Sequence, residues 1–92
     1  MSLNVREIAE EFCLSEECLT QEGLKAFLLQ QLRLLESERR ARCAKFGVST
    51  LEEMDDLLKR GIVTEEEILD DFQNVDYLTT RIERIQKLLR DS

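Results

Sequence analysis

The sequence of 92 residues contains no histidine, no proline and no tryptophan. Without histidine, the chain cannot form a Ser-His or Cys-His dyad for nucleophilic catalysis. Its three glycines stand alone, so no glycine-rich loop is available to hold a phosphate group. We therefore predict no catalytic residue, no cofactor-binding residue and no resident metal.

Cysteine is also scarce, with only Cys13, Cys18 and Cys43. No CxxC pair occurs, and no histidine could complete a zinc site. We expect all three to be small buried side chains in a reducing cytosol. The N-terminus has no basic-then-apolar signal pattern, and no apolar run approaches the roughly 18 residues of a membrane span. The expected location is therefore the cytoplasm, with no membrane contact.

The composition and the capping signals favour an all-α protein. Leu, Glu and Arg are the commonest residues, and helix-capping residues recur where apolar periodic segments begin. Asn4 and Thr64 are each followed three residues later by a glutamate, and Thr20 precedes a long apolar stripe. We predict one domain over residues 1–92, with short N-terminal helices in 5–19, a long helix 21–46, a short helix 50–60 and a long helix 65–90.

The last helix carries a heptad pattern of apolar residues. Ile68, Val75, Ile82 and Leu89 recur every seven residues, and Leu78 and Ile85 fill the intervening positions. A leucine stripe on the first long helix faces it in our prediction. The fold class is thus an antiparallel helical hairpin of two long helices, forming a dimeric helical bundle. The predicted interaction seam comprises Leu28, Leu32, Leu35, Ile68, Val75, Leu78, Ile82, Ile85 and Leu89.

One polar residue, Asp71, interrupts this seam. An unpaired carboxylate there would be unfavourable, and an antiparallel hairpin brings the basic end of the first long helix close to it. We predict that Arg39 or Arg42 pairs with Asp70 or Asp71, inside the seam or at its edge. Such a pair would fix the register of the helices more than it would add net stability.

The net charge of −7 makes the chain a poor candidate for binding nucleic acid. Two hints of such binding exist: residues 4–15 have some features of a helix-turn-helix, and basic residues cluster at one helix end. The segment after residue 15 is acidic, however, where a recognition helix should meet phosphate. The basic cluster consists of Arg39, Arg40, Arg42 and Lys45.

A magnesium-dependent enzyme is the other alternative. Helical nucleotide pyrophosphohydrolases hold magnesium with ExxE and ExxD pairs, and this chain has one of each. Glutamate-rich helices also produce such pairs by chance. The residues concerned are Glu7, Glu10, Glu67 and Asp70.

Roughly residues 45–89 carry a family resemblance. The matching stretches are the Lys-Phe-Gly break at 45–47, the acidic segment 51–61 and the acidic-aromatic run 70–78. The chain resembles a group of small prokaryotic helical proteins that look like antitoxin-type or other regulatory partners. It departs from them in having Phe46 for the usual tyrosine. The resemblance implies a non-enzymatic interaction or regulatory module with a protein partner, which is our principal hypothesis; we also expect a homodimer.

Overall fold

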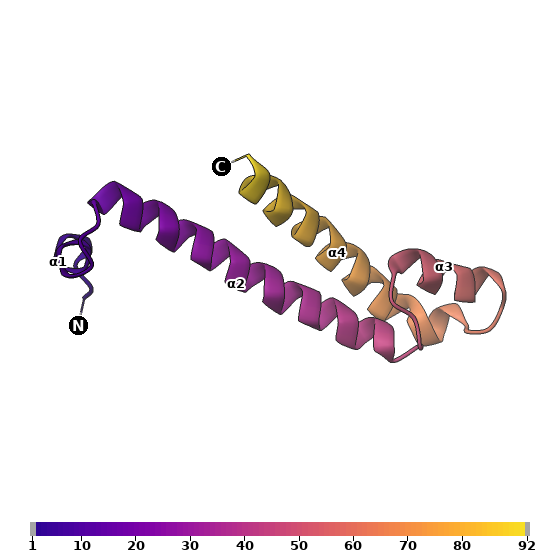
Figure 1. Ribbon diagram of the computed structural model, residues 1–92. Helices are drawn as coiled ribbons and strands as arrows, with labels where there is room; N and C mark the ends of the chain where they lie inside the picture. The colour runs from indigo at the N-terminus through magenta and orange to yellow at the C-terminus, as the bar shows by residue number, and fades with distance from the viewer. Residues whose placement is uncertain (1, 92) are drawn as a thin grey trace. The chain divides into compact units, whose positions relative to one another are not determined.

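The computed structural model describes residues 2–91, which form four α-helices and no strand (Figure 1). The all-α prediction is confirmed for this part of the chain. Contacts divide the chain into two compact units, with residues up to 31 in the first and residues from 32 onward in the second. The pairing of the two long helices as a full-length hairpin stays a prediction. The helices are α1 (Val5–Glu11), α2 (Glu16–Ala44), α3 (Leu51–Lys59) and α4 (Glu65–Arg90).

Each helix begins after a side chain that accepts a hydrogen bond from a backbone N–H of the first turn. This contact satisfies a donor that has no partner within the helix, and acidic residues follow in every first turn, where the helix dipole favours them. The capping side chains are Asn4, Ser15, Thr50 and Thr64, with N···O distances of 2.9 to 3.3 Å.

The start of α2 differs from the prediction. The helix begins at Glu16, not at residue 21, and it absorbs the second short helix expected before Thr20. The Ser15 hydroxyl accepts from the Cys18 N–H at 2.9 Å. Ser15 has a hydroxyl side chain like that of Thr20, so either residue can cap a helix. No glycine or proline separates them, so the helix that starts at the first cap continues through the second.

Left-handed residues close α1 and α2. Gly47 has φ +68°, and the Val48 N–H donates to the Cys43 carbonyl at 3.2 Å, which is the pattern of a Schellman motif. Cys13 has φ +56° and is the only described non-glycine residue with a positive φ. The Leu14 N–H donates to the Ala9 carbonyl at 2.8 Å. A cysteine therefore occupies the position that usually favours glycine.

The core of the second unit joins the end of α2 to α3 and α4. It contains Cys43, Met54, Ile68 and Val75, each at most 1% exposed. Helix α3 packs against α4 (Figure 1). Met54 of α3 is fully buried. Half-buried side chains surround this core: Phe46, Val48, Leu51, Leu58, Val63 and Phe72.

The first unit has almost no core. Among residues 2–31, Ala9 alone is buried, at 2% exposure. Ile8, Leu19 and Leu28 are half-buried. A unit of this size gains little hydrophobic stabilisation from so few buried side chains, since that stabilisation scales with the apolar area removed from water.

Candidate functional site

The first unit contains an apolar hollow of about 350 Å³ between α1 and the start of α2. Thr20 contributes the one polar side chain to its lining. Gly23 has no side chain, so it leaves space in the hollow. A Cβ atom built on Gly23 would meet nothing within 4 Å. The lining residues are Leu3, Val5, Ile8, Leu19, Thr20, Gly23 and Leu24.

Large apolar side chains of the first unit face solvent. Leu3 is 85% exposed, Phe12 67%, Phe27 58% and Leu24 55%. Leu24 and Phe27 stand one helical turn apart on α2, next to the half-buried Leu28. Contiguous exposed apolar surface of this kind marks interaction sites in folded proteins. The sequence analysis did not predict this hollow; Gly23 lies one turn after Leu19 and directly before Leu24.

The first unit is acidic in composition. Residues 2–31 contain six glutamates and only two basic side chains, Arg6 and Lys25. The Arg6 guanidinium Nε lies 3.5 Å from a carboxylate oxygen of Glu10, one turn along α1, so that glutamate already has a cation beside it. The first unit therefore combines exposed apolar side chains with a net negative charge.

Most of the predicted seam is buried within a single copy of the chain. Of its α4 residues, Ile68, Val75, Leu78, Ile82 and Ile85 are each at most 6% exposed. Helix burial at heptad spacing is what the sequence pattern led us to expect. The remaining seam residues, Leu28, Leu32, Leu35 and Leu89, are half-buried.

An ion cluster joins α2 to α4 in the second unit. Arg42 Nη1 donates to Asp71 Oδ1 at 2.9 Å and lies 3.8 Å from Asp70 Oδ2. Lys45 Nζ donates to the same Asp71 oxygen at 3.1 Å, a partner that sequence reasoning did not name. Arg39 instead donates to the Thr79 hydroxyl at 3.4 Å. The cluster leaves Arg42 Nε without a hydrogen-bond acceptor, 3.7 Å from a Glu38 oxygen.

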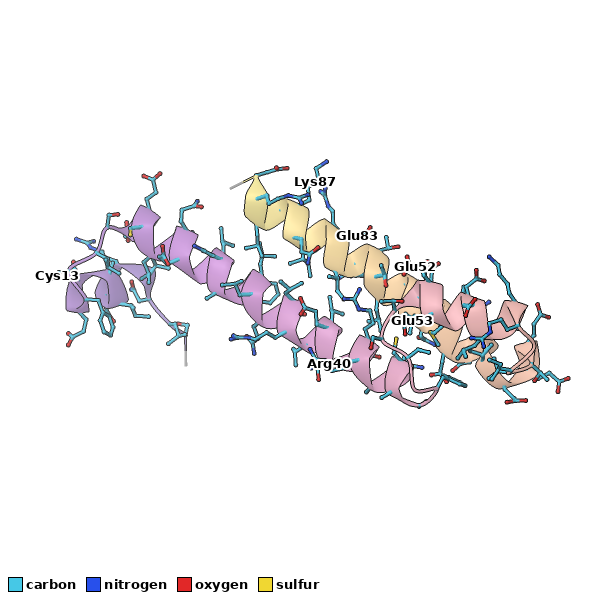
Figure 2. All side chains as sticks on the ribbon, turned by 45° about the vertical axis from the view of Figure 1, so that its right-hand side comes forward. Cys13, Arg40, Glu52, Glu53, Glu83 and Lys87 are labelled. Atoms are coloured by element: carbon cyan, nitrogen blue, oxygen red, sulfur yellow. The ribbon has the colours of Figure 1, made fainter. Side chains whose placement is uncertain are left out.

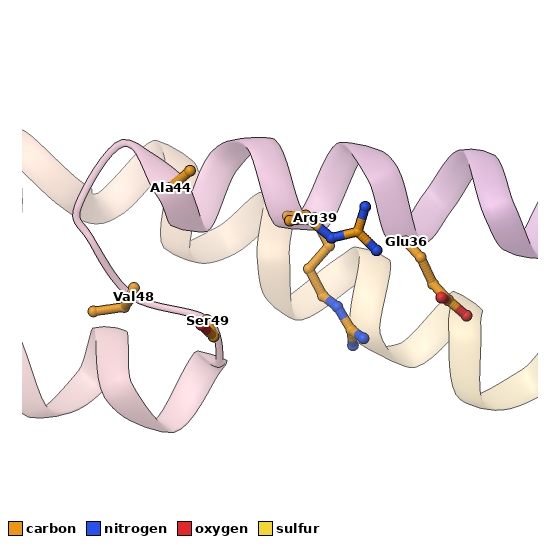
Figure 3. A pocket seen from close by; sticks show the side chains of 6 residues that line it. Glu36, Arg39, Ala44, Val48 and Ser49 are labelled. Atoms are coloured by element: carbon orange, nitrogen blue, oxygen red, sulfur yellow. The ribbon is translucent and has the colours of Figure 1, made fainter.

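A second hollow, of about 340 Å³, lies where α2 meets the segment leading to α3 (Figure 3). Its polar lining includes Arg39, Arg40, Glu36 and Ser49. Arg40 projects from α2, while Glu52 and Glu53 lie at the start of α3 (Figure 2). The Glu53 carboxylate already accepts from the Ser49 N–H at 3.1 Å. Of the basic cluster that the nucleic-acid-binding alternative would use, Arg42 and Lys45 contact Asp71.

The carboxylates of the magnesium alternative fall in separate units. Glu7 and Glu10 belong to the first, and Glu67 and Asp70 to the second. Glu67 also accepts a hydrogen bond from the Thr64 hydroxyl at 3.1 Å. Within residues 2–91, no group of three or more cysteine, aspartate or glutamate side chains is placed to share a metal ion.

The expected burial of all three cysteines is wrong for two of them. Cys13 (Figure 2) and Cys18 are exposed, whereas Cys43 is buried. Cys13 lies in the left-handed turn after α1, and Cys18 lies in the first turn of α2, in the unit that has almost no core. Burial raises the pKa of the Cys43 thiol; nearby Arg39 opposes this and Glu53 adds to it.

No helix in the described part of the chain combines the length and the apolar character that a membrane crossing requires.

No solved structure matches the chain. The chain is similar to the uncharacterised protein MJ0235 of Methanocaldococcus jannaschii. The two are 32% identical over 75 residues, which cover 82% of this chain and 92% of that protein. The model of the uncharacterised protein MJ0235 family matches residues 1–92. On this match, the chain belongs to the MJ0235 family of uncharacterised proteins.

Proposed function

We propose that the chain is a non-enzymatic protein-interaction module that acts as a regulatory, antitoxin-like partner. The observation that carries the proposal is the exposed apolar surface of the first unit, where Phe12, Leu24 and Phe27 are all more than half exposed. Large apolar side chains left in water favour association, because burying them removes apolar surface from the solvent. A protein partner would complete a core that the unit does not form by itself.

The second unit is well packed by itself. Its core residues Cys43, Met54 and Val75 have no exposed area, and they tie the end of α2 to α3 and α4. The antitoxin-type resemblance concerns this unit, through residues 45–49, 51–61 and 70–78. A chain with one well-packed unit and one poorly packed, apolar unit suits a partner protein better than an enzyme, whose site needs chemical groups held on rigid elements.

Capture of the partner from the native host tests the proposal. We compare the wild-type chain with Leu24→Glu and, as a matched control, Leu34→Glu. The two leucines lie on the same helix and are 55% and 56% exposed. We expect one stoichiometric protein partner to bind the wild-type chain and the control, and to be lost from Leu24→Glu. Equal capture by both variants, or no stoichiometric partner for the wild type, would refute the proposal.

The homodimer is a second part of the proposal. Since the α4 seam is already buried in one copy, a second copy would use exposed apolar residues of α2 outside the hollow, such as Leu29 at 39% exposure. Sedimentation equilibrium at tens of micromolar should give twice the 10.8 kDa mass of the chain. A strict monomer at that concentration would contradict the dimer and leave the partner-binding proposal standing.

A further inference from the structure

The hollow of the first unit has the form of a helix-binding groove. Two helices wall it, α1 with the residues before it on one side and α2 on the other. The described residues contain no strand, so they offer no sheet edge to which an extended peptide could add. An amphipathic helix fits such a groove with apolar residues at i, i+3, i+4 and i+7.

The apolar surface continues beyond the hollow along α2. Leu24 belongs to the lining, and Phe27 and Leu28 follow it three and four positions later on the same face. The contact surface is therefore longer than one side chain and runs in the direction of a helix axis. A small apolar ligand would fill the hollow but leave Phe27 in water.

Charge selects among the possible occupants. The unit contains six glutamates against Arg6 and Lys25. A second copy would bring the same excess of negative charge to the interface. Anionic lipid surfaces attract basic amphipathic helices, and nucleic acid attracts basic proteins, so this acidic unit suits neither. A partner with cationic residues beside its apolar face is attracted by the negative charge of the unit. This attraction raises the association rate and orients the partner.

We propose that the hollow formed by Leu3, Val5, Ile8, Leu19, Gly23 and Leu24 binds an amphipathic helix of a partner protein, with lysine or arginine flanking its apolar face. This inference rests on the proposed function and deepens it by naming the binding surface and the chemistry of the partner. The apolar row of the partner enters the hollow above Gly23 and extends over Phe27, and its cationic flanks lie near the glutamates of the unit.

Gly23 provides the sharpest variant. Its backbone is not left-handed, and a side chain added there would enter open space. Gly23→Leu therefore places a side chain in the hollow, while leucine also has a higher helix propensity than glycine. Leu34→Ala is the control, because it removes an equally exposed leucine of α2 that does not line the hollow.

The test uses the full chain and three synthetic peptides of equal length in a fluorescence anisotropy titration. One has a leucine row with lysine flanks, one has the same row with glutamate flanks, and one keeps the lysines but scrambles the leucines. We expect the first to bind at least about tenfold more tightly than either of the others, and to weaken as salt rises. Gly23→Leu should lose at least about tenfold in affinity for it. Leu34→Ala should not.

Each contrary outcome has a defined meaning. Equal affinity for the lysine and glutamate peptides would overturn the charge argument. Equal affinity for the scrambled peptide would show that the peptide binds through non-specific charge attraction and not through its apolar row. Unchanged affinity in Gly23→Leu, or loss of a self-associated dimer in that variant, would overturn the hollow as the partner's site. If Leu24→Glu loses the native partner while Gly23→Leu keeps it, this inference fails and the proposed function stands.

Discussion

The Arg42 guanidinium lies 2.9 Å from the carboxylate of Asp71, a seam residue that is only 8% exposed. Lys45 shares the same carboxylate oxygen at 3.1 Å. A buried carboxylate is tolerated because these cations and their hydrogen bonds replace the water it has lost. The pair links the last turns of α2 to the first half of α4, in the unit that holds the core.

Removal of Arg42 should therefore destabilise the fold. Arg42→Ala leaves Asp71 with only the more exposed Lys45, and we expect the free energy of unfolding to fall by about 1–3 kcal/mol. Urea denaturation measures this change. Arg60→Ala is the control, since it removes an exposed ion pair with Asp56 and should change stability by less than about 1 kcal/mol. Equal effects of the two variants would contradict a stabilising role for the buried pair.

Asp71→Leu separates stability from register. A leucine at this position continues the apolar seam, so we expect the free energy of unfolding to be retained or raised. The pairing of the helices should become less specific, and sedimentation should detect a change in the number of associated copies. A variant that matches the wild type in association and is equally or more stable would contradict the register role.

Substitutions at the two left-handed turns should have opposite effects on stability. Gly47→Ala should lower stability by about 1–2 kcal/mol, because an alanine side chain is unfavourable at φ +68°. Cys13→Gly should slow amide exchange in α1, because it relieves a cysteine at φ +56°. Urea denaturation measures the first effect, and hydrogen exchange measures the second. A stabilising Gly47→Ala, or faster exchange in Cys13→Gly, would contradict these assignments.

The cysteines should differ in reactivity and in pH dependence. In the folded chain, Cys13 and Cys18 should react quickly with a thiol reagent, and Cys43 slowly. Burial raises the pKa of Cys43 above the ordinary value of 9.0, so above pH 9 the unfolded chain loses this proton first. The contribution of this thiol to the free energy of unfolding is complete below pH 9. It declines as the pH rises toward the pKa of the folded state.

Cys43→Ala tests that linkage directly. The variant should be less stable near neutral pH, since it leaves a small cavity in the core, but its stability should fall less between pH 9 and 10 than that of the wild type. Denaturation at several alkaline pH values measures the difference. Parallel pH profiles for the two proteins would show that Cys43 does not titrate differently on folding.

Magnesium should not affect the fold. The candidate carboxylates Glu67 and Asp70 lie on α4, and Glu67 is engaged with Thr64 at the helix start. We expect millimolar Mg²⁺ to leave the thermal unfolding midpoint unchanged. A rise that disappears in Asp70→Asn but persists in Glu65→Gln would restore the magnesium-dependent enzyme as an explanation.

Local signals predicted much of the helical structure. Thr64 with Glu67 marked the start of α4, Gly47 marked the turn after α2, and heptad spacing marked the buried residues of α4. These features depend on neighbours within a turn or two, so a sequence contains them directly. The start of α2 was predicted too late because Ser15 and Thr20 can both cap a helix, and the sequence alone does not decide between them.

The candidate site was harder to predict. The leucines around Gly23 have the same spacing whether they are covered or exposed, and only the packing of α1 on α2 decides between the two. Lys45 likewise carries no sign that it shares the carboxylate of Asp71, because that contact depends on how α2 ends. Exposure and long-range pairing are properties of the folded chain.

Hydrogen exchange of the chain alone and with its captured partner tests the central claim most directly. The partner should slow exchange in residues 2–31, where Ala9 is the one buried side chain and the apolar surface is open. Residues 32–91, already held by the core around Met54, should change little. Protection confined to residues 32–91, with residues 2–31 unchanged, would contradict the account.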